Sequence, residues 1–514
     1  MARPKLTSHF TMKPKKPQKI LQNITIDKLW YWWVGIGRAQ DGKKVLVSGG
    51  VLPGSVIDVI VTRSRKDFFE WRVFFVHSTD PNYTTRSAPC PHYYLPANQT
   101  ADSGLPPYKT GCGGCKWQQV NYDKQLELKQ QSVIDSFRSI KLLLENTDIR
   151  YCLPSPEEFG YRNKIEYSFG DFLQWDVKNA RALGFHKQGQ FSQIIDIDEC
   201  LLVSPRMRNL FQHIKALCRE SWLPVYNQVK HTGFFRHLVM REGKNTEQIL
   251  INFCIATQHM DSAMTKQREA LQQAFLHDEL LQKHVTTRIV SVNNGLWDAV
   301  FTHETQQSLL RGDGYIYEKL TMAHTDEWVQ PTYRISANSF FQTNTHGAEL
   351  LFSTAYSLLG HVAWPLIDLY CGTWTIGIAF AKLTGITDLV GIEIVPEAIV
   401  DAHYNAQING LWWAYFVAGK AEQLIKTDET FAHACEKTDC IIVDPPRDWL
   451  HKSVTEFLTQ LRQQKSYKLL YISCNPVTLA RDIEILSSAF KISIIQPVDM
   501  FPHTHHVETI CLLS

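Results

Sequence analysis

The sequence lacks any run of about 18 apolar residues, so no membrane-spanning helix is expected. It also lacks an apolar leader: residues 1–20 contain six basic residues, three prolines and no acidic residue, which predicts a disordered basic tail. Twelve cysteines in 514 residues are too few for a disulfide scaffold and indicate reduced thiols in a cytoplasmic protein. The 53 basic residues nearly balance the 51 acidic ones, which excludes a uniformly basic nucleic-acid coat protein.

The charges are unevenly distributed along the chain. Residues 331–514 contain 12 Lys and Arg against 18 Asp and Glu, so residues 1–330 carry the positive excess. A basic front half is typical of a part that binds a polyanion, although two domains that merely differ in charge would give the same pattern.

Turn dipeptides and short β-branched runs alternate through residues 21–80. The dipeptides Asp41-Gly42, Gly49-Gly50 and Pro53-Gly54 separate strand-like segments at the spacing of a small five-stranded, OB-like β-barrel. Basic and aromatic residues are interleaved in its later part, as base stacking and phosphate binding require: Arg63, Arg65, Lys66, Phe68, Phe69, Trp71 and Arg72. An ordinary barrel with a polar rim is the alternative.

The rest of the chain divides into two parts. Residues 81–330 mix strand-like pieces with amphipathic helices and predict a central α+β domain. From residue 331 onward, short apolar runs each precede a segment of helical length: LIDLYCG, DLVGIEI, CIIVDPP and KLLYISC. This alternation predicts a Rossmann-like, doubly wound parallel sheet that binds ligands at the carboxyl ends of its strands.

Three cysteines lie close together in the sequence of the central part. Cys90 precedes the pair Cys112 and Cys115, whose two intervening glycines let both thiolates face one centre. A tetrahedral thiolate site needs a fourth ligand, for which Cys152 and Cys200 are the nearest downstream candidates. Zinc and an iron–sulfur cluster both accept four thiolates, so the spacing leaves the choice open.

A turn that suits a ribose-containing cofactor begins at Asp368. The segment from Asp368 to Gly377 combines a strand end, a Gly-bearing turn and a helix start, and Glu393 ends the next strand. An acidic residue at that distance binds ribose hydroxyls in S-adenosylmethionine as well as in NAD. The turn is not GxGxxG, which disfavours a dinucleotide oxidoreductase.

Three further strand ends carry reactive side chains. Asp444 opens a rigid Asp-Pro-Pro turn followed by Arg447, where an enzyme acting on exocyclic amines needs an aromatic residue to stack on the base. Cys474 follows the next strand, in the position of a nucleophile. Glu508 begins the last strand after three nearby histidines, which could suggest a metal site but more simply form a polar loop.

Together these motifs resemble the bacterial RNA uracil-C5 methyltransferases. The segments that carry the resemblance run from about residue 25 to the C-terminus: CGGCKWQ, YRNKIEYSF, NSFFQTN, DLYCG, VDPPR, SCNPVTLARD and VDMFPHTHHVE. The sequence is similar in particular to the 23S ribosomal RNA 5-methyluridine enzymes with a TRAM domain and a [4Fe-4S] cluster. The resemblance implies a TRAM barrel over residues 21–80, a cluster-bearing domain over residues 81–330 and an S-adenosylmethionine domain over residues 331–514.

The resemblance also implies roles for individual residues. Cys474 would be the nucleophile and Glu508 the base that removes the carbon 5 proton of a uridine flipped out of a structured RNA. The implied cofactor contacts are Gln342, Tyr370, Thr375, Glu393 and Asp444. The implied cluster ligands are Cys90, Cys112, Cys115 and Cys200, the last in the segment DIDECLL. A monomer acting on ribosomal RNA is expected.

Three tryptophans depart from the family pattern. Trp374 occupies the second glycine of the CGxGxxG turn, Trp449 replaces the glycine of DPPRxG, and Trp413 stands where asparagine is common. Because glycine lets a ligand lie against the backbone, Trp374 is expected either to turn out to solvent or to lie across the cofactor pocket. Two rival functions follow: a transfer RNA uracil methyltransferase, and a non-catalytic RNA-binding or chaperone relative.

Overall fold

The computed structural model divides into two compact units, Met1–Asn82 with Leu95–Lys109, and Tyr83–Tyr94 with Thr110–Ser514. It describes residues 19–30, 34–48, 51–64, 68–83, 86–93, 111–138, 140, 147–172, 180–187, 190–324, 327–360, 365–447 and 450–514. All but the last two residues of the predicted basic tail therefore lie outside the described residues.

The first unit contains a closed β-barrel with the strand order β1-β2-β3-β5-β4. Its strands are β1 (Ile20–Trp30), β2 (Val34–Arg38), β3 (Lys44–Ser48), β4 (Val56–Ser64) and β5 (Phe68–Ser78). Alternate residues point inward, so that Ile24, Ile26, Val45 and Val47 form part of its apolar core. The side chains of residues 62–72, which include the interleaved basic and aromatic residues, lie outside the described part.

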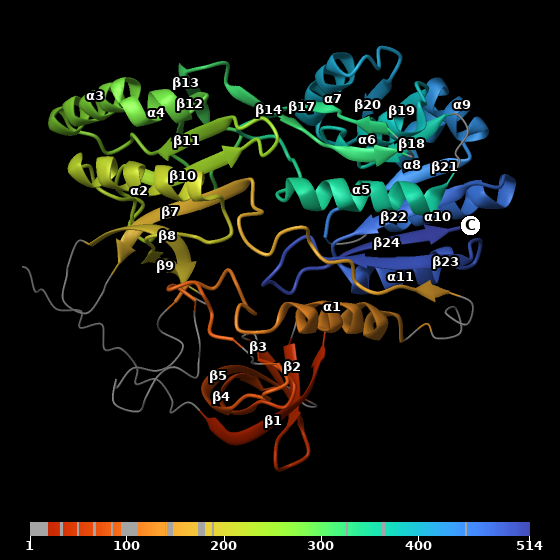
Figure 1. Cartoon of the computed structure of the whole chain (residues 1–514), viewed down its shortest axis with the longest axis horizontal. Helices are drawn as coiled ribbons and strands as arrows, with labels where there is room; N and C mark the ends of the chain where they lie inside the picture. Colours follow the sequence, from red (N-terminus) through yellow and green to blue (C-terminus); the bar gives the residue numbers. More distant parts are fainter. Residues whose placement is uncertain are drawn as a thin grey trace, which may run out of the picture. The chain divides into compact units, whose positions relative to one another are not determined.

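The second unit contains a seven-stranded sheet with the strand order β13-β12-β11-β10-β7-β8-β9. The strands are β7 (Lys164–Phe172), β8 (Ala180–Lys187), β9 (Gln190–Asp196), β10 (Phe235–Glu242), β11 (Ile249–Ile255), β12 (Thr287–Val292) and β13 (Gln306–Arg311). Helices α2 (Pro205–Glu220), α3 (Ser262–His277) and α4 (Glu279–His284) lie beside it (Figure 1). An apolar cluster between α2 and the strands, which includes Tyr167, Phe211 and Leu238, forms the core here.

Two short hairpins follow and lead into the last sheet. They pair β14 (Tyr315–Lys319) with β17 (Thr332–Ser336), and β15 (Met322–His324) with β16 (Glu327–Val329). The side chain of Glu318 in β14 is fully buried and accepts hydrogen bonds from the Lys244 amide (2.7 Å) and the Thr345 hydroxyl (2.8 Å). These bonds link the seven-stranded sheet to the helix that starts at Thr345.

The last sheet has eight strands in the order β20-β19-β18-β21-β22-β24-β23-β6. Its strands are β6 (Asp148–Ile149), β18 (Leu366–Leu369), β19 (Leu389–Glu393), β20 (Tyr415–Ala418), β21 (Cys440–Val443), β22 (Lys468–Ser473), β23 (Ile492–Val498) and β24 (Glu508–Leu513). The strands from β20 to β22 are parallel, and β24 runs antiparallel between β22 and β23. Apolar clusters on both faces show that helices cover the sheet on both sides.

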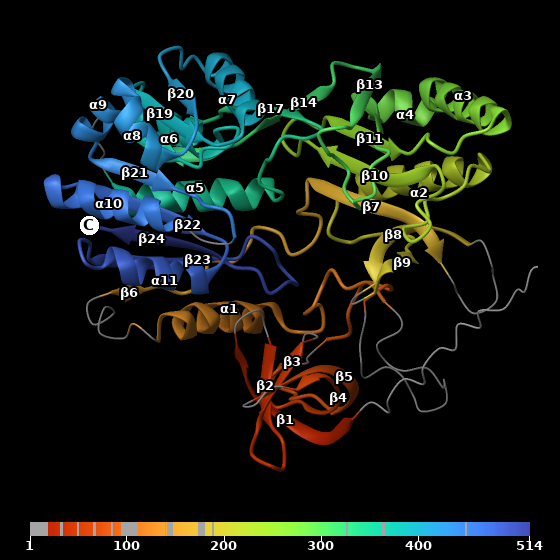
Figure 2. The same ribbon diagram turned by 180° about the vertical axis from the view of Figure 1, so that it is seen from behind.

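These helices come from the C-terminal half and from one earlier segment (Figure 2). They are α1 (Tyr122–Phe137), α5 (Thr345–Leu359), α6 (Thr375–Thr384), α7 (Pro396–Ile408), α8 (Ala421–Thr427), α9 (Glu429–Lys437), α10 (Lys452–Gln464) and α11 (Pro476–Leu486). Although α1 and β6 precede the seven-stranded sheet in the sequence, α1 packs on α11 and β6 pairs with β23. The prediction of a mixed α/β protein is confirmed. Within the described residues, no helix combines the length and apolar character needed to cross a membrane.

Candidate active site

The carboxyl ends of the parallel strands gather the predicted site residues at one edge of the eight-stranded sheet. Leu369 of β18 pairs with Ile392 of β19 and with Val443 of β21. Tyr370, Glu393 and Asp444 are each one residue further along, so the three lie side by side. This is the edge at which parallel sheets bind ligands.

Strand register also brings Cys474 to Glu508. Ser473, the last residue of β22, pairs with Thr509 near the start of the antiparallel strand β24. The next residue on β22 and the preceding residue on β24 are therefore neighbours. Asn475 then caps α11, its side chain accepting from the Val477 amide at 3.2 Å, so that Cys474 lies in a tight strand-to-helix turn.

The Cys474 thiol is influenced by three charged side chains. Burial raises its pKa to about 12, and the negative charges of Glu508 and Asp444 act in the same direction. The guanidinium of Arg447 lowers the pKa of Cys474 by its charge and by a hydrogen bond. Arg447 is thus the group that favours the thiolate over the thiol.

The two carboxyl groups at this edge are protonated more readily than ordinary acids. Burial raises the pKa of Glu508 to about 8, and the nearby charge of Asp444 adds to this effect. Burial also raises the pKa of Asp444 to about 7. Such a pKa suits a side chain that must accept a proton near neutral pH.

The turn after β18 is strained and folds back on Glu393. Tyr370 and Gly372 have φ values of 64° and 55°, in the left-handed region. The Gly372 amide donates to Glu393 Oε2 at 3.1 Å, and the Val395 amide donates to Glu393 Oε1 at 2.9 Å. The carboxylate of Glu393 is therefore fixed at the end of β19, where the sequence predicted a ribose contact.

Asp368, in β18, is a fully buried acid. Burial raises its pKa far above the ordinary value, the charges of Asp444 and Glu393 raise it further, and a hydrogen bond from the Gly377 amide acts in the opposite direction. Three neighbouring acids at one edge of the sheet favour a ligand that carries positive charge. A sulfonium or ammonium group meets this requirement, so the residues fit S-adenosylmethionine.

The remaining predicted cofactor residues lie beside this turn. Thr375 is the first residue of α6, and its carbonyl accepts from the Tyr333 hydroxyl at 3.1 Å. Gln342 is largely buried, and its segment is joined to the turn because Thr373 Oγ1 donates to the Phe340 carbonyl at 3.0 Å. The roles of Thr375 and Gln342 as cofactor contacts stay predictions.

Trp374 lies inside the protein. It has φ 67° and ψ 40°, and its side chain is fully buried. The indole packs edge-to-face against Phe416, with ring centroids 4.5 Å apart, and covers Gly377, where an added Cβ would clash with Nε1 of the indole. The expectation that the indole turns out to solvent is therefore wrong. Burial of its apolar surface in the core is more favourable in free energy than exposure to water.

Replacing Trp374 with glycine is expected to tighten S-adenosylhomocysteine binding at least tenfold, about 1.4 kcal/mol. Glycine removes the indole that covers Gly377 and leaves the backbone of the turn open to the ligand. The free energy of unfolding should nevertheless fall, because losing a buried aromatic side chain costs about 3–5 kcal/mol. Calorimetric titration and urea unfolding measure the two effects.

Trp222→Gly is the matched control for this change. Trp222 is also left-handed, with φ 58°, but its side chain is 75% exposed and belongs to the seven-stranded-sheet part. This variant should leave cofactor affinity unchanged and raise stability by up to about 1 kcal/mol. Equal cofactor affinities of Trp374→Gly and the unchanged protein would show that the turn already accommodates the indole.

The other two unusual tryptophans have different outcomes. Trp413 is 83% exposed, so its indole lies on the protein surface after α7. Trp449 lies outside the described residues.

The four predicted cluster ligands are neighbours in space. The charges of Cys200, Cys112 and Cys90 all raise the pKa of Cys115, and the charge of Cys90 also raises that of Cys112. Burial is the main cause of the raised pKa of Cys200, about 12, and the charges of Cys112 and Cys90 add to it. Cys152 interacts instead with Lys129 and Asp499.

Metal coordination itself is not established by this arrangement. Among the residues that the structure describes, no group of three or more His, Cys, Asp or Glu side chains is arranged so that it could hold a metal ion. The cluster therefore stays a prediction, and so does the choice of its ligands.

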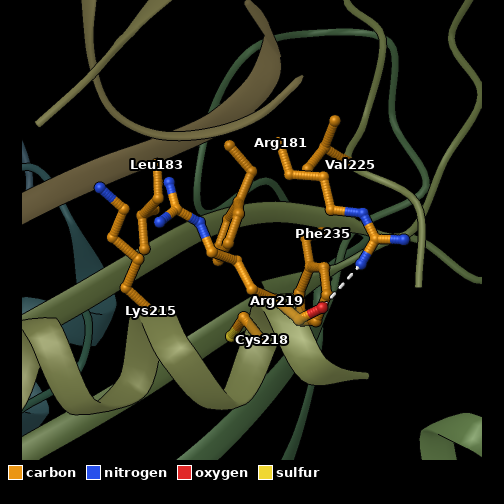
Figure 3. Close-up of a pocket in the computed structure, with 8 residues that line it drawn as sticks. Arg181, Leu183, Lys215, Cys218, Arg219, Val225 and Phe235 are labelled. Carbon is orange, nitrogen blue, oxygen red and sulfur yellow. Dashed lines mark hydrogen bonds between the residues drawn. The ribbon is translucent and has the colours of Figure 1, made fainter. Parts of the chain in front are cut away.

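A small pocket lies elsewhere, between α2 and the seven-stranded sheet (Figure 3). It is lined by Phe169, Arg181, Leu183, Lys215, Cys218, Arg219, Val225 and Phe235. Its guanidinium groups already have partners: Arg181 donates to the carbonyls of Arg219 (3.1 Å) and Trp222 (2.8 Å), at the end of α2. Lys215 and Arg219 both donate to Asp196 Oδ2, at 2.9 and 2.7 Å. None of the predicted site residues lines this pocket.

Sequence reasoning assigned no role to two of the residues at the strand edge. Asp368 was visible as the first residue of the cofactor turn, and its position inside an apolar strand was the signal that it is buried. Arg447 was interpreted only as evidence against an amine substrate, although its charge and its hydrogen bond lower the pKa of Cys474. Nothing in the sequence shows which distant thiol an arginine will approach.

Comparisons with known proteins agree with this geometry. Residues 276–514 match the family model described as tRNA (Uracil-5-)-methyltransferase. A protein of Chlorobaculum tepidum, described as an uncharacterized RNA methyltransferase, is 32% identical over 92% of both chains. A protein of Clostridium acetobutylicum with the same description is 33% identical over 96% of this chain and 97% of its own.

A solved structure covers nearly the whole chain as well. It is the tRNA (uracil-54, C5)-methyltransferase of Pyrococcus abyssi in complex with S-adenosyl-L-homocysteine. The two proteins are 26% identical with a TM-score of 0.66, and the match covers 96% of this chain and all of the other.

Proposed function

The chain belongs to the RNA uracil-5 methyltransferase family, and we propose that it methylates carbon 5 of a uridine in 23S ribosomal RNA. The observation that carries the proposal is the register of β22 and β24. It makes Cys474 and Glu508 neighbours at the carboxyl ends of the parallel strands, beside Asp444. A thiol that can add to carbon 6 and a carboxylate that can remove the carbon 5 proton are the two groups that this reaction requires.

Each of these side chains performs one bond change on the uracil ring. The Cys474 thiolate, stabilised by Arg447, forms a bond to carbon 6 and moves an electron pair toward carbon 5. S-adenosylmethionine, when bound, supplies the methyl group that carbon 5 accepts. Glu508 then removes the proton from carbon 5, and the released electron pair restores the ring double bond and expels the Cys474 thiolate.

The cofactor would be held by the residues of the strand edge. Glu393 is fixed by two backbone amides and would bind the ribose hydroxyls. Asp368 and Asp444 would face the positive charge, and Gln342, Tyr370 and Thr375 would line the remaining sides. The barrel of residues 20–78 would act as a TRAM-like module that binds single-stranded RNA.

Transfer RNA is the second candidate substrate. The similarity to the Pyrococcus abyssi enzyme, which covers 96% of this chain, favours it. Incubation of the protein with labelled S-adenosylmethionine and either 23S ribosomal RNA or transfer RNA separates the two. We expect 5-methyluridine at one site of the ribosomal RNA; labelling of transfer RNA alone would establish the alternative. A protein that labels neither RNA and binds S-adenosylmethionine weakly would be a non-catalytic relative.

We further propose that Cys90, Cys112, Cys115 and Cys200 hold a [4Fe-4S] cluster. Support comes from Cys115, whose pKa is raised by the charges of Cys200, Cys112 and Cys90, and from Cys200, whose pKa is raised by those of Cys112 and Cys90. All four are free thiols, as cluster ligation requires.

Anaerobically purified protein is expected to be brown and to contain about four irons per chain. Cys200→Ala should lose the colour and most of the iron. Cys152→Ala is the matched control, because Cys152 is also buried but interacts with other residues, and it should keep both. Colourless protein with one zinc per chain would contradict the cluster.

A further inference from the structure

The loop of residues 499–507, here called the hairpin loop, joins β23 to β24, and Glu508 directly follows it at the start of β24. Val498 and Glu508 are the last paired residues before it. Its backbone is held from outside the hairpin, because Lys129 donates to the Phe501 carbonyl (3.0 Å) and Tyr161 donates to the Pro502 carbonyl (3.2 Å).

His503, near the middle of the hairpin loop, receives two hydrogen bonds from the cysteine loop, residues 111–117. The amides of Lys116 and Trp117 donate to the His503 carbonyl at 2.7 and 3.1 Å. The imidazole of His503 is fully buried and stacks on Phe159, with ring centroids 4.2 Å apart. His503 also has φ 65°, so surrounding contacts must hold this strained backbone in place.

One side chain, that of Gln125 in α1, binds both loops. Its Oε1 accepts from the His503 amide at 2.8 Å. Its Nε2 donates to the Trp117 carbonyl at 3.1 Å and to the Val120 carbonyl at 3.0 Å. The side chain is completely buried, so water cannot replace these bonds without opening the structure.

We propose that Gln125 is a positioning residue, which joins the cysteine loop to the hairpin loop and thereby holds Glu508 in place to remove the carbon 5 proton. The inference rests on the proposed function and deepens it. Cys474 has separate support in the turn between β22 and α11, where Asn475 Nδ2 donates to the Arg447 carbonyl at 3.1 Å. Gln125 therefore acts on proton removal and leaves thiol addition unchanged.

Addition of the thiol and removal of the proton can be studied separately by changing the substituent on carbon 5 from hydrogen to fluorine. With uridine, a displaced Glu508 leaves the carbon 5 proton in place, so the bond between Cys474 and carbon 6 persists and turnover slows. With 5-fluorouridine, no proton is present at carbon 5, and the covalent complex accumulates whether or not Glu508 is well placed. A misplacement of about 1 Å can lower a rate by about 10²-fold.

The test compares Gln125→Leu with Gln131→Leu in the full-length protein. Gln131 lies on the same helix, is exposed and bonds only to Asp135 among the contacts that the structure describes. We expect Gln125→Leu to lower turnover on uridine-containing RNA at least tenfold and to accumulate its covalent complex. Its rate of complex formation with 5-fluorouridine RNA should equal that of the unchanged protein. Gln131→Leu should match the unchanged protein in every assay.

A pH profile gives a second readout. Glu508 faces Asp444, Arg447 and Cys474. The turnover of the unchanged protein should rise with pH toward about 8, because the Glu508 carboxyl group then loses its proton. Freeing the hairpin loop admits water, which lowers the pKa of Glu508, so the rise should begin at lower pH in Gln125→Leu. If Gln125→Leu does not fold, Gln125→Met, which keeps an unbranched side chain and adds no buried charge, removes the same hydrogen bonds and should show the same separation of the two steps.

Three results would overturn the inference. Equal turnover of Gln125→Leu and Gln131→Leu would show that Gln125 positions nothing. Parallel loss of turnover and of 5-fluorouridine complex would show that Gln125 only supports the fold. Failure of the unchanged protein to form that complex would refute the proposed function itself, and the inference with it.

Discussion

Cys474→Ala is expected to abolish methylation of RNA and to prevent any covalent complex with 5-fluorouridine RNA. Without the thiol no bond forms to carbon 6, and carbon 5 of uracil is too weak a nucleophile to react by itself. Loss of a covalent nucleophile lowers turnover by many orders of magnitude, so a fall of at least about 10³-fold is expected. Denaturing gels of protein incubated with RNA, and counting of transferred methyl groups, measure the two effects.

Cys511→Ala is the control for this experiment. Cys511 is buried in the middle of β24, three residues beyond Glu508 and away from the strand edge. Its removal should leave the covalent complex intact. A complex that survives in Cys474→Ala would place the nucleophile elsewhere. Cys371, a free thiol within the turn of residues 368–377, would then be the next residue to replace.

The same experiment tests the part played by Arg447. Because this side chain favours the Cys474 thiolate, complex formation should slow when it is removed, and raising the pH should restore part of the rate. The direction follows from the thiol's pKa, since a thiol that has lost its cationic neighbour requires a higher pH to ionise.

The strand edge could be predicted from the sequence because parallel sheets have a simple geometry. Each apolar run ended in a reactive residue, and the ends of parallel strands lie together, so Tyr370, Glu393, Asp444 and Cys474 had to be neighbours. Glu508 also follows from this geometry, provided that the last strand is antiparallel.

Contacts between distant segments could not be predicted in this way. Nothing in the pattern of residues 122–149 indicates that α1 and β6 join the eight-stranded sheet, because their apolar spacing fits any apolar surface. The packing partner of Trp374 could not be predicted for a related reason. Its side chain packs on Phe416, a residue 42 positions later in the sequence.

The contact between α1 and the hairpin loop also depends on a buried ion pair. Lys129 Nζ lies 2.5 Å from Asp499 Oδ1, and neither side chain is exposed at all. Asp499 additionally accepts from the Tyr122 hydroxyl (3.0 Å) and the Phe501 amide (2.9 Å). With these partners the desolvated charges are fully compensated, which is the condition under which a buried pair is tolerated.

Lys129→Met is therefore expected to lower the free energy of unfolding by about 3–5 kcal/mol, because it leaves the charge of Asp499 buried without a counter-ion. Lys129→Met combined with Asp499→Asn should recover a large part of this loss, since no unpaired charge remains. The control is Lys124→Met on the same helix: Lys124 pairs with Glu127 at 2.7 Å on the surface, where solvent screening leaves such pairs little effect on stability. Urea unfolding of the four proteins measures these differences. If Lys129→Met and Lys124→Met cost equally little, water reaches Asp499, and the hairpin loop is held by its backbone hydrogen bonds alone.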